Sequence, residues 1–286
     1  VEGRVFSDCR LPDLSPPERR GIYLSMVQTL ARMHRVRPDQ IGLADFGRPG
    51  DYFARQIHRW TSQLKASSFA DDKVLLALSA RLAELQPPDD GLSSIAHGDF
   101  RLGNLLVDAE GVAAVLDWEL VHLGDPVEDL GWLCAKAWRF GGSTPVAGMG
   151  DRTSLLDAYA REAGWRPTEQ ALRWWELYAT VKWGLICAVQ AARHLDGVER
   201  SVELAAIGRR SAEQEFDALL DLGLVTPGPV PDPLAEAPAE EPDNDLYGSP
   251  TAVELLEALT EFLRSDAVQA DLSPQVRFHT RVAGNV

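Results

Sequence analysis

Three polar side chains near the middle of the chain have the types and the spacing that phosphoryl transfer requires. Asn104 follows Asp99 by five residues, and Asp117 follows Asn104 by thirteen. Mg²⁺ prefers oxygen ligands and takes few of them from protein, so Asn104 and Asp117 are candidate metal ligands. Asp99 is then a candidate general base, the group that accepts the proton of an attacking hydroxyl. We therefore predict a phosphoryl-transfer site built from these three residues.

A β-hairpin is predicted between the two candidate metal ligands. Apolar residues at 105–107 and 112–116 flank the turn Asp-Ala-Glu-Gly, a pattern typical of two antiparallel strands. Pairing of these strands would bring Asn104 and Asp117 together, and a short strand at 93–96 leads into the loop that carries Asp99. The alternative is that all three residues are only turn formers, because Asp and Asn favour loops. Their joint spacing favours a functional role.

Composition disfavours several classes of partner. The 286 residues are 45% hydrophobic and 25% charged, which is typical of a globular protein, and the formal net charge is −15. This charge argues against nucleic acid or an anionic membrane as a partner. The apolar run at 183–192 is too short to cross a bilayer. The three cysteines, Cys9, Cys134 and Cys187, lack C-x-x-C spacing and predict reduced thiols, a cytoplasmic location and no zinc site.

Most of the remaining chain is predicted to be helical. A Ser followed by Pro-Pro-Glu begins a helix at 15 that continues to His34. Further helices are expected at 51–65, 71–85, 126–140, 154–164, 168–194 and 198–222. The helix at 168–194 is long for a globular protein, and two shorter helices with a break near Gly184 are the alternative. Residues 1–6 have a short β-like pattern, and His122 is expected in a loop after Asp117.

The composition changes sharply after residue 225. Residues 226–245 contain six Pro and six acidic residues without Lys or Arg, which predicts an extended linker. We therefore predict one domain at 1–225, a linker at 226–246 and the start of a small helical domain at 247–286. Because the chain begins with Val1 and ends within a predicted helix, we expect it to be a fragment of a longer protein.

The motifs around the predicted site resemble those of a known family. They read H-G-D-F-R-L-G-N at 97–104 and L-D-W-E-L-V-H-L-G-D-P-V-E-D-L at 116–130. Both resemble the aminoglycoside phosphotransferase or choline kinase-like superfamily, in particular the kinase domains fused to acyl-CoA dehydrogenases. E-G-R-V-F, G-L-A-D-F-G-R-P-G-D-Y and W-E-L-Y-A-T-V-K-W extend the resemblance over 1–224. It implies an α+β, protein-kinase-like fold, mainly the helical C-terminal lobe with a small β-hairpin at the catalytic loop.

The resemblance also implies roles for neighbouring residues. Asp129 matches a residue that braces the catalytic loop through its backbone, and His97 matches a structural histidine that organises the same loop. Trp118 and Glu119 adjoin Asp117 and are candidates for the pocket, with a solvated loop position as the equal alternative for Glu119. For Asp125, capping of the following helix is favoured over a catalytic role.

The implied activity is an ATP- and Mg²⁺-dependent phosphotransferase acting on a hydroxyl of a small molecule. A hydroxyacyl thioester ranks above an aminoglycoside as the acceptor. We expect no nucleic acid or membrane partner, and the oligomeric state is left open.

One departure from the family pattern concerns the nucleotide. Kinase-like enzymes use a strand Lys at the nucleotide phosphates, but all four lysines fall in predicted helices, at Lys65, Lys73, Lys136 and Lys182. We therefore expect the N-terminal lobe to lie outside this chain and the fragment alone to be inactive. A non-catalytic binding or scaffold remnant of such a kinase is the alternative, and a Mg²⁺-dependent hydrolase is a third possibility.

Overall fold

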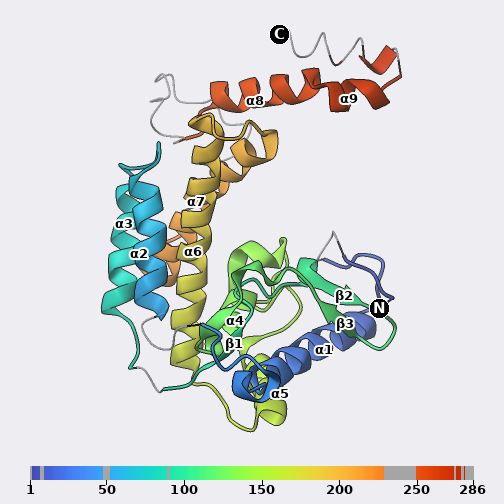
Figure 1. Cartoon of the computed structure of the whole chain (residues 1–286), viewed down its shortest axis with the longest axis vertical. Helices are drawn as coiled ribbons and strands as arrows, with labels where there is room; N and C mark the ends of the chain where they lie inside the picture. Colours follow the sequence, from blue (N-terminus) through green and yellow to red (C-terminus); the bar gives the residue numbers. More distant parts are fainter. Residues whose placement is uncertain are drawn as a thin grey trace. The chain divides into compact units, whose positions relative to one another are not determined.

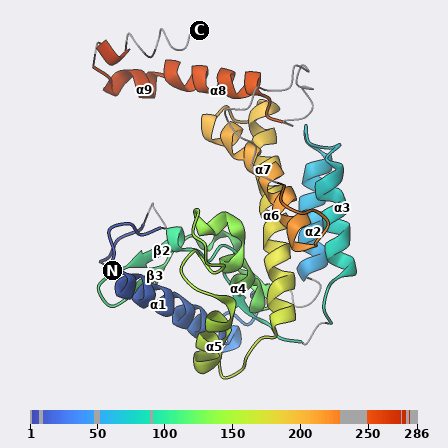
Figure 2. The same ribbon diagram turned by 180° about the vertical axis from the view of Figure 1, so that it is seen from behind.

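The computed structural model describes residues 2–6, 10–47, 52–88, 91–228, 249–273, 275–277 and 280. Contacts divide the chain into two compact units, Val1–Ile57 with Ser79–Thr180, and His58–Leu78 with Val181–Val286. Figures 1 and 2 show their helices and short strands from opposite sides. Across the described residues, no helix combines the length and the apolar character that a membrane span needs.

The first unit contains the segment predicted to carry the site. Its helices and strands are α1 (Pro16–His34), the start of α2 (Tyr52–Lys65), the end of α3 (Lys73–Glu84), β1 (Ser94–Ala96), β2 (Leu105–Val107), β3 (Val112–Val115), β4 (His122–Gly124), α4 (Val127–Cys134), α5 (Arg152–Ala163) and the first part of α6 (Glu169–Leu195). Short 3₁₀ helices lie at η1 (Pro38–Ile41), η2 (Leu102–Asn104), η3 (Trp118–Leu120) and η4 (Lys136–Arg139).

Helix α1 begins where the sequence predicts. The backbone N–H of Ser15 donates to the carboxylate of Glu18 (2.7 Å), a contact that satisfies an otherwise unpaired donor at the helix start. The apolar face of α1 is buried against α5 and the hairpin. The hydroxyl of Ser25 accepts the backbone N–H of Val112 (2.8 Å) and so joins α1 to β3 (Figure 1).

The predicted hairpin is confirmed as the antiparallel pair β2 and β3, in which Leu105 lies opposite Val115. Its turn is closed by Asp108, whose carboxylate accepts the backbone N–H groups of the two residues before β3, at 2.8 and 3.1 Å. The β-like pattern at 1–6 forms a single bridge between Arg4 and Val107 rather than a strand.

Two expectations for this unit were wrong. The loop expected to contain His122 includes β4, which pairs antiparallel with β1 so that Ala96 lies opposite His122. The helix expected at 126–140 ends at Cys134 and is followed by the separate turn η4. The guanidinium of Arg139 donates to the backbone carbonyl of Cys134 (2.8 Å), which has no partner within the helix. The backbone leaves the helical conformation at Ala135, with φ −54° and ψ 136°.

The second unit is helical in its described part. It contains the end of α2, the start of α3, the second part of α6, and α7 (Val202–Asp221), α8 (Ala252–Arg264) and α9 (Asp266–Asp271). The alternative of a break near Gly184 is not realised, because α6 continues through this residue. An added Cβ at Gly184 would lie 3.0 Å from Leu75 and 3.2 Å from Gln214, so this glycine permits close packing of α3 and α7 on α6.

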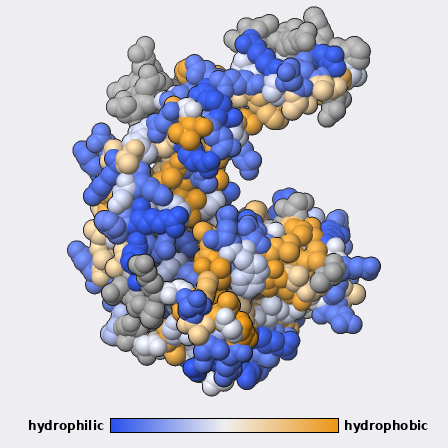
Figure 3. All heavy atoms as spheres, in the orientation of Figure 1, coloured by the Kyte–Doolittle hydropathy of each residue, from blue (hydrophilic) through white to orange (hydrophobic). Residues whose placement is uncertain are grey.

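At the start of α8, the backbone N–H of Thr251 donates to the carboxylate of Glu254 (2.6 Å). An ion pair between Arg200 and Glu261 joins it to the segment before α7. One side of α8 carries exposed apolar residues, Val253, Leu256, Leu259 and Phe262 (Figure 3).

Several predictions fall outside the described residues. They concern Cys9, the first residue of the helix expected at 51–65, most of the linker at 226–246, and residues 274, 278–279 and 281–286 of the domain expected at 247–286. The domain boundaries at 225 and 246 stay predictions.

Replacement by alanine of two glycines in helices should have opposite effects on the free energy of unfolding. An added Cβ at Gly131 of α4 would lie 2.5 Å from the backbone carbonyl carbon of Trp175 in α6, which cannot move aside. We therefore expect Gly131→Ala to lower the free energy of unfolding by about 1–3 kcal/mol. Gly21 of α1 has nothing within 4 Å of an added Cβ, so Gly21→Ala should raise it by about 0.5–1 kcal/mol.

Urea unfolding of the two variants and the wild type measures both effects. A Gly131→Ala protein as stable as the wild type would contradict the contact between α4 and α6.

Candidate functional site

A buried carboxylate of α4 holds the loop that follows β1. Asp129 is fully buried, and its oxygens accept the backbone N–H groups of His97 (2.7 Å) and Gly98 (2.8 Å). His34, at the end of α1, lies 3.1 Å from the same carboxylate through Nε2 and pairs through Nδ1 with the hydroxyl of Tyr159 (2.9 Å). Burial alone would raise the pKa of Asp129, but His34 and the two amides outweigh it and lower the pKa.

His97 joins this loop to the end of the hairpin. Its buried ring accepts the backbone N–H of Asp99 at Nδ1 (3.2 Å), so the proton lies on Nε2, which donates to the carbonyl of Leu116 (2.9 Å). Leu116 immediately precedes Asp117. Gly98 permits the close approach, because its φ is +81° and an added Cβ would lie 2.8 Å from a backbone carbonyl oxygen of η3.

Three side chains converge on the carboxylate of Asp99. The indole of Trp132 donates to Oδ1 (2.8 Å), and the amide of Asn104 donates to Oδ2 (2.6 Å). The guanidinium of Arg101 lies 3.1 Å from Oδ1, and the Asp99 side chain is 17% exposed. Trp132 lies three residues after Asp129, on the same face of α4. A single helix therefore positions both the backbone of this loop and its carboxylate.

Asn104 is the buried last residue of η2, directly before β2, and its amide nitrogen is bonded to Asp99. Nδ2 donates to both the carbonyl (3.0 Å) and the carboxylate (2.6 Å) of that residue. In this orientation the amide oxygen of Asn104 is available to bind another group, because none of the described residues donates a hydrogen bond to it. The backbone carbonyl of Asn104 accepts the N–H of Leu116 (2.8 Å), so Asn104 and Asp117 flank the base of the hairpin.

Asp117 lies exposed after β3 in the left-handed conformation, with φ 63° and ψ 61°. Asp adopts this conformation more readily than most residues. Within the described chain, no hydrogen bond or ion pair engages its carboxylate. Trp118 packs against His97, with ring centroids 4.9 Å apart, and its indole donates to the carbonyl of Val115 (2.9 Å). Glu119 is exposed in η3.

Asp125 lies at the start of α4, where its carboxylate accepts the backbone N–H of Val127 (2.8 Å) and the indole N–H of Trp175 (3.0 Å). It therefore caps the helix, as its position in the sequence suggested. Nearby, Nε2 of His122 lies 3.0 Å from the buried carboxylate of Glu128.

Sequence reasoning missed three residues that contact the predicted site. Trp132 and Arg101 hold the carboxylate of Asp99, and His34 holds that of Asp129. The spacing of Trp132 from Asp129 was visible in the sequence, but a Trp among apolar residues of a helix is typical of core packing. His34 is 95 residues from Asp129, and no pattern in the sequence connects them.

The predicted donor set fits a hard divalent cation. The amide oxygen of Asn104 and the carboxylate of Asp117 are oxygen donors of the kind that Mg²⁺ prefers. Nowhere in the described part of the chain do three or more His, Cys, Asp or Glu side chains form a metal-binding group. A cation held here would therefore take its remaining ligands from water or phosphate, which is usual for Mg²⁺.

The short strands and the surrounding helices form a protein-kinase-like fold. The sequence model of the phosphotransferase enzyme family, APH, matches residues 1–175. The chain belongs to this family.

Comparison with known proteins supports the fold and the branch of the family. A crystal structure from Ralstonia eutropha, described as that of a candidate aminoglycoside phosphotransferase, superimposes with a TM-score of 0.70 and is 34% identical, covering 79% of this chain and 72% of that chain. The predicted α+β, protein-kinase-like fold is thereby confirmed. Human acyl-CoA dehydrogenase family member 11 is 39% identical over 132 residues, and mouse family member 10 is 40% identical over 134. Each match covers 46% of this chain but only 17% and 12% of those relatives.

We expect Asp129→Asn to destabilise the protein by about 1–3 kcal/mol at neutral pH, because an amide can accept only one of the two buried N–H groups. Since the folded-state pKa of Asp129 is lowered, its stabilising contribution is present above the ordinary pKa of 3.8 and is lost as the pH falls through the folded-state pKa. The difference in free energy of unfolding between wild type and variant should therefore narrow in acid. Urea unfolding at neutral pH and at successively lower pH below 3.8 measures this difference.

Asp157→Asn is the matched control. Asp157 is 56% exposed and, among the described residues, pairs with Arg166 alone at the surface, so its replacement should change stability by less than about 1 kcal/mol. Equal destabilisation by both substitutions would contradict the bracing role of Asp129.

Proposed function

We propose that this protein is an ATP- and Mg²⁺-dependent kinase that transfers the γ-phosphate of ATP to a hydroxyl group of a small molecule. The proposal is carried by one arrangement of side chains. The carboxylate of Asp99 is held by three donors yet reaches solvent, and it is bonded to Asn104, which flanks the base of the hairpin together with the exposed Asp117. Membership of the phosphotransferase family supports phosphoryl transfer as the class of reaction.

Each residue has a distinct task in this proposal. When bound, Mg²⁺ would neutralise charge on the phosphates. Asn104 and Asp117 would hold the ion, and Asp99 would orient the acceptor hydroxyl and accept its proton. Trp132 and Arg101 hold the carboxylate of Asp99 in one orientation, so the base meets each acceptor in the same geometry.

For the acceptor we favour a hydroxyacyl thioester over an aminoglycoside. The relatives that are 39% and 40% identical are acyl-CoA dehydrogenase family members, and their name indicates acyl thioesters. A kinase joined to such an enzyme in one polypeptide is well placed to act on a hydroxyl of the same class of molecule. The Ralstonia relative, at 34% identity, supports the aminoglycoside alternative.

Substitution of Asp99 and Asp117 separates the two proposed roles. In the full-length protein, ATP turnover is measured with a panel of hydroxyacyl thioesters, aminoglycosides and choline. We expect Asp99→Asn to lower kcat by about 10²–10⁴-fold, the usual contribution of a general base, with metal affinity retained. Asp117→Asn should lower turnover and also weaken binding of Mn²⁺, which is followed by the electron paramagnetic resonance signal of the free ion.

Glu110→Gln is the control, because it removes the same charge from the exposed turn of the same hairpin. It should leave turnover and Mn²⁺ affinity unchanged. Undiminished turnover in Asp99→Asn would sink the assignment of the base. Phosphate release without any acceptor would indicate a hydrolase, and a wild-type protein that neither turns over ATP nor binds Mn²⁺ would indicate a non-catalytic remnant.

A further inference from the structure

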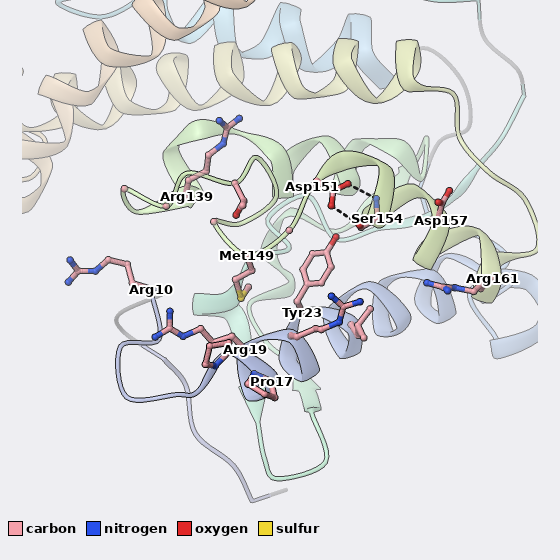
Figure 4. A pocket seen from close by; sticks show the side chains of 18 residues that line it. Arg10, Pro17, Arg19, Tyr23, Arg139, Met149, Asp151, Ser154, Asp157 and Arg161 are labelled. Atoms are coloured by element: carbon pink, nitrogen blue, oxygen red, sulfur yellow. Dashed lines mark hydrogen bonds between the residues drawn. The ribbon is translucent and has the colours of Figure 1, made fainter. Parts of the chain in front are cut away.

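A second feature of the first unit is a cavity rich in arginine. It has a volume of about 950 Å³ and lies between α1, the loop at 139–150 and α5 (Figure 4). Five arginines line it, Arg10, Arg19, Arg20, Arg139 and Arg161, against two acidic residues. This positive surface is unexpected in a chain with a formal net charge of −15. It contains none of the residues of the predicted phosphoryl-transfer site.

The two acidic residues in the wall are already engaged. The carboxylate of Asp157 accepts from the guanidinium of Arg166 (2.8 Å), which lies outside the lining. The carboxylate of Asp151 caps α5 by accepting the backbone N–H (2.8 Å) and the hydroxyl (2.6 Å) of Ser154. Among the described residues, neither carboxylate forms an ion pair with an arginine of the cavity.

Three of the lining arginines have no carboxylate partner in the described part of the chain. Arg19 donates only to backbone carbonyls, at 2.9 and 3.4 Å, and Arg20 and Arg161 make neither a hydrogen bond nor an ion pair there. Arg139 differs, because it pairs with Glu176 (2.9 Å). Like charges placed around one cavity repel each other, and a bound anion would remove that repulsion.

Two hydroxyl groups in the wall also lack partners. The Oη of Tyr23 and the Oγ1 of Thr144 are buried without a hydrogen bond among the described residues, and Tyr23 is only 5% exposed. The Tyr23 hydroxyl points towards the start of α5 (Figure 4). Burial raises the pKa of Tyr23 well above its ordinary value, so this hydroxyl is protonated and can donate. A buried donor without an acceptor is unfavourable, and an anion in the cavity would supply one.

We propose that this cavity binds a small molecule bearing two or more phosphate groups. Arginine presents several N–H donors in a rigid fork that matches phosphate geometry, and three such groups lack a counter-charge here. A volume of about 950 Å³ is in the range of sites for whole small molecules rather than for a single ion. The hydroxyls of Tyr23 and Thr144 supply further donors to phosphate oxygens.

Isothermal titration calorimetry of the chain, without divalent metal, tests the proposal with defined probes. These are inorganic phosphate, pyrophosphate, fructose 1,6-bisphosphate and the dicarboxylate succinate. We expect pyrophosphate or the bisphosphate to bind most tightly, and the stronger of the two identifies an inorganic or an organic phosphate as the source. Binding of succinate as tight as either would overturn the phosphate assignment, as would the absence of binding by both phosphate probes.

Arg20→Gln with Arg161→Gln should weaken binding of the better probe by about tenfold or more, because two charge-assisted contacts are lost. Arg32→Gln with Arg37→Gln removes the same charge from side chains that are 65% and 70% exposed outside the cavity, and it should leave the affinity nearly unchanged. An equal loss in both double variants would show that the net charge of the protein, and not this cavity, sets the affinity.

Tyr23→Phe tests the cavity without changing any charge. Since it removes an unpaired buried hydroxyl, the melting temperature of the ligand-free protein should stay the same or rise. The increase in melting temperature caused by the probe should shrink, because one donor to the ligand is gone. If the probe raised the melting temperature of Tyr23→Phe as much as that of the wild type, the probe would bind elsewhere on the protein.

Discussion

The geometry of the site depends on one buried charge, the carboxylate of Asp129. A buried carboxylate is strongly unfavourable unless donors surround it, and here it has the backbone N–H groups of His97 and Gly98 together with His34. These donors come from the loop after β1 and from α1. Satisfying the charge therefore fixes three separate segments at once, and the loop that carries Asp99 has little freedom to move without leaving the charge unpaired.

The side chain of Asp99 is positioned by the same helix that anchors its backbone. Trp132, one turn after Asp129 on α4, donates to the Asp99 carboxylate, while Asn104 contributes a second bond from the start of the hairpin. His97 completes the connection by bonding both to the backbone of Asp99 and to the carbonyl of Leu116. The proposed base and the proposed metal ligands are thus held by a helix, a hairpin and a buried imidazole, which are more rigid supports than a loop alone.

The features that could be predicted from the sequence are those that depend on interactions between residues close together in the chain. The hairpin follows from a turn closed by Asp108, and its pairing places Asn104 near Asp117 without information from the rest of the fold. Strand β4 was missed because its partner β1 is distant in the sequence, and the early end of α4 depends on the side chain of Arg139. For the same reason no local pattern could reveal the contact between His34 and Asp129.

The predicted site and the arginine-lined cavity are connected by one short element, η4. Trp138 of this turn packs against Trp132, with ring centroids 5.3 Å apart, and lies beneath the guanidinium of Arg101 at 5.1 Å. The next residue, Arg139, lines the cavity. Coupling between two sites requires an element with two arrangements. Arg139 is bound to the carbonyl of Cys134 and to the buried carboxylate of Glu176, and these bonds hold η4 in one arrangement. The predicted site and the cavity therefore share one supporting turn, and the bonds of Arg139 fix that turn to α4 and α6.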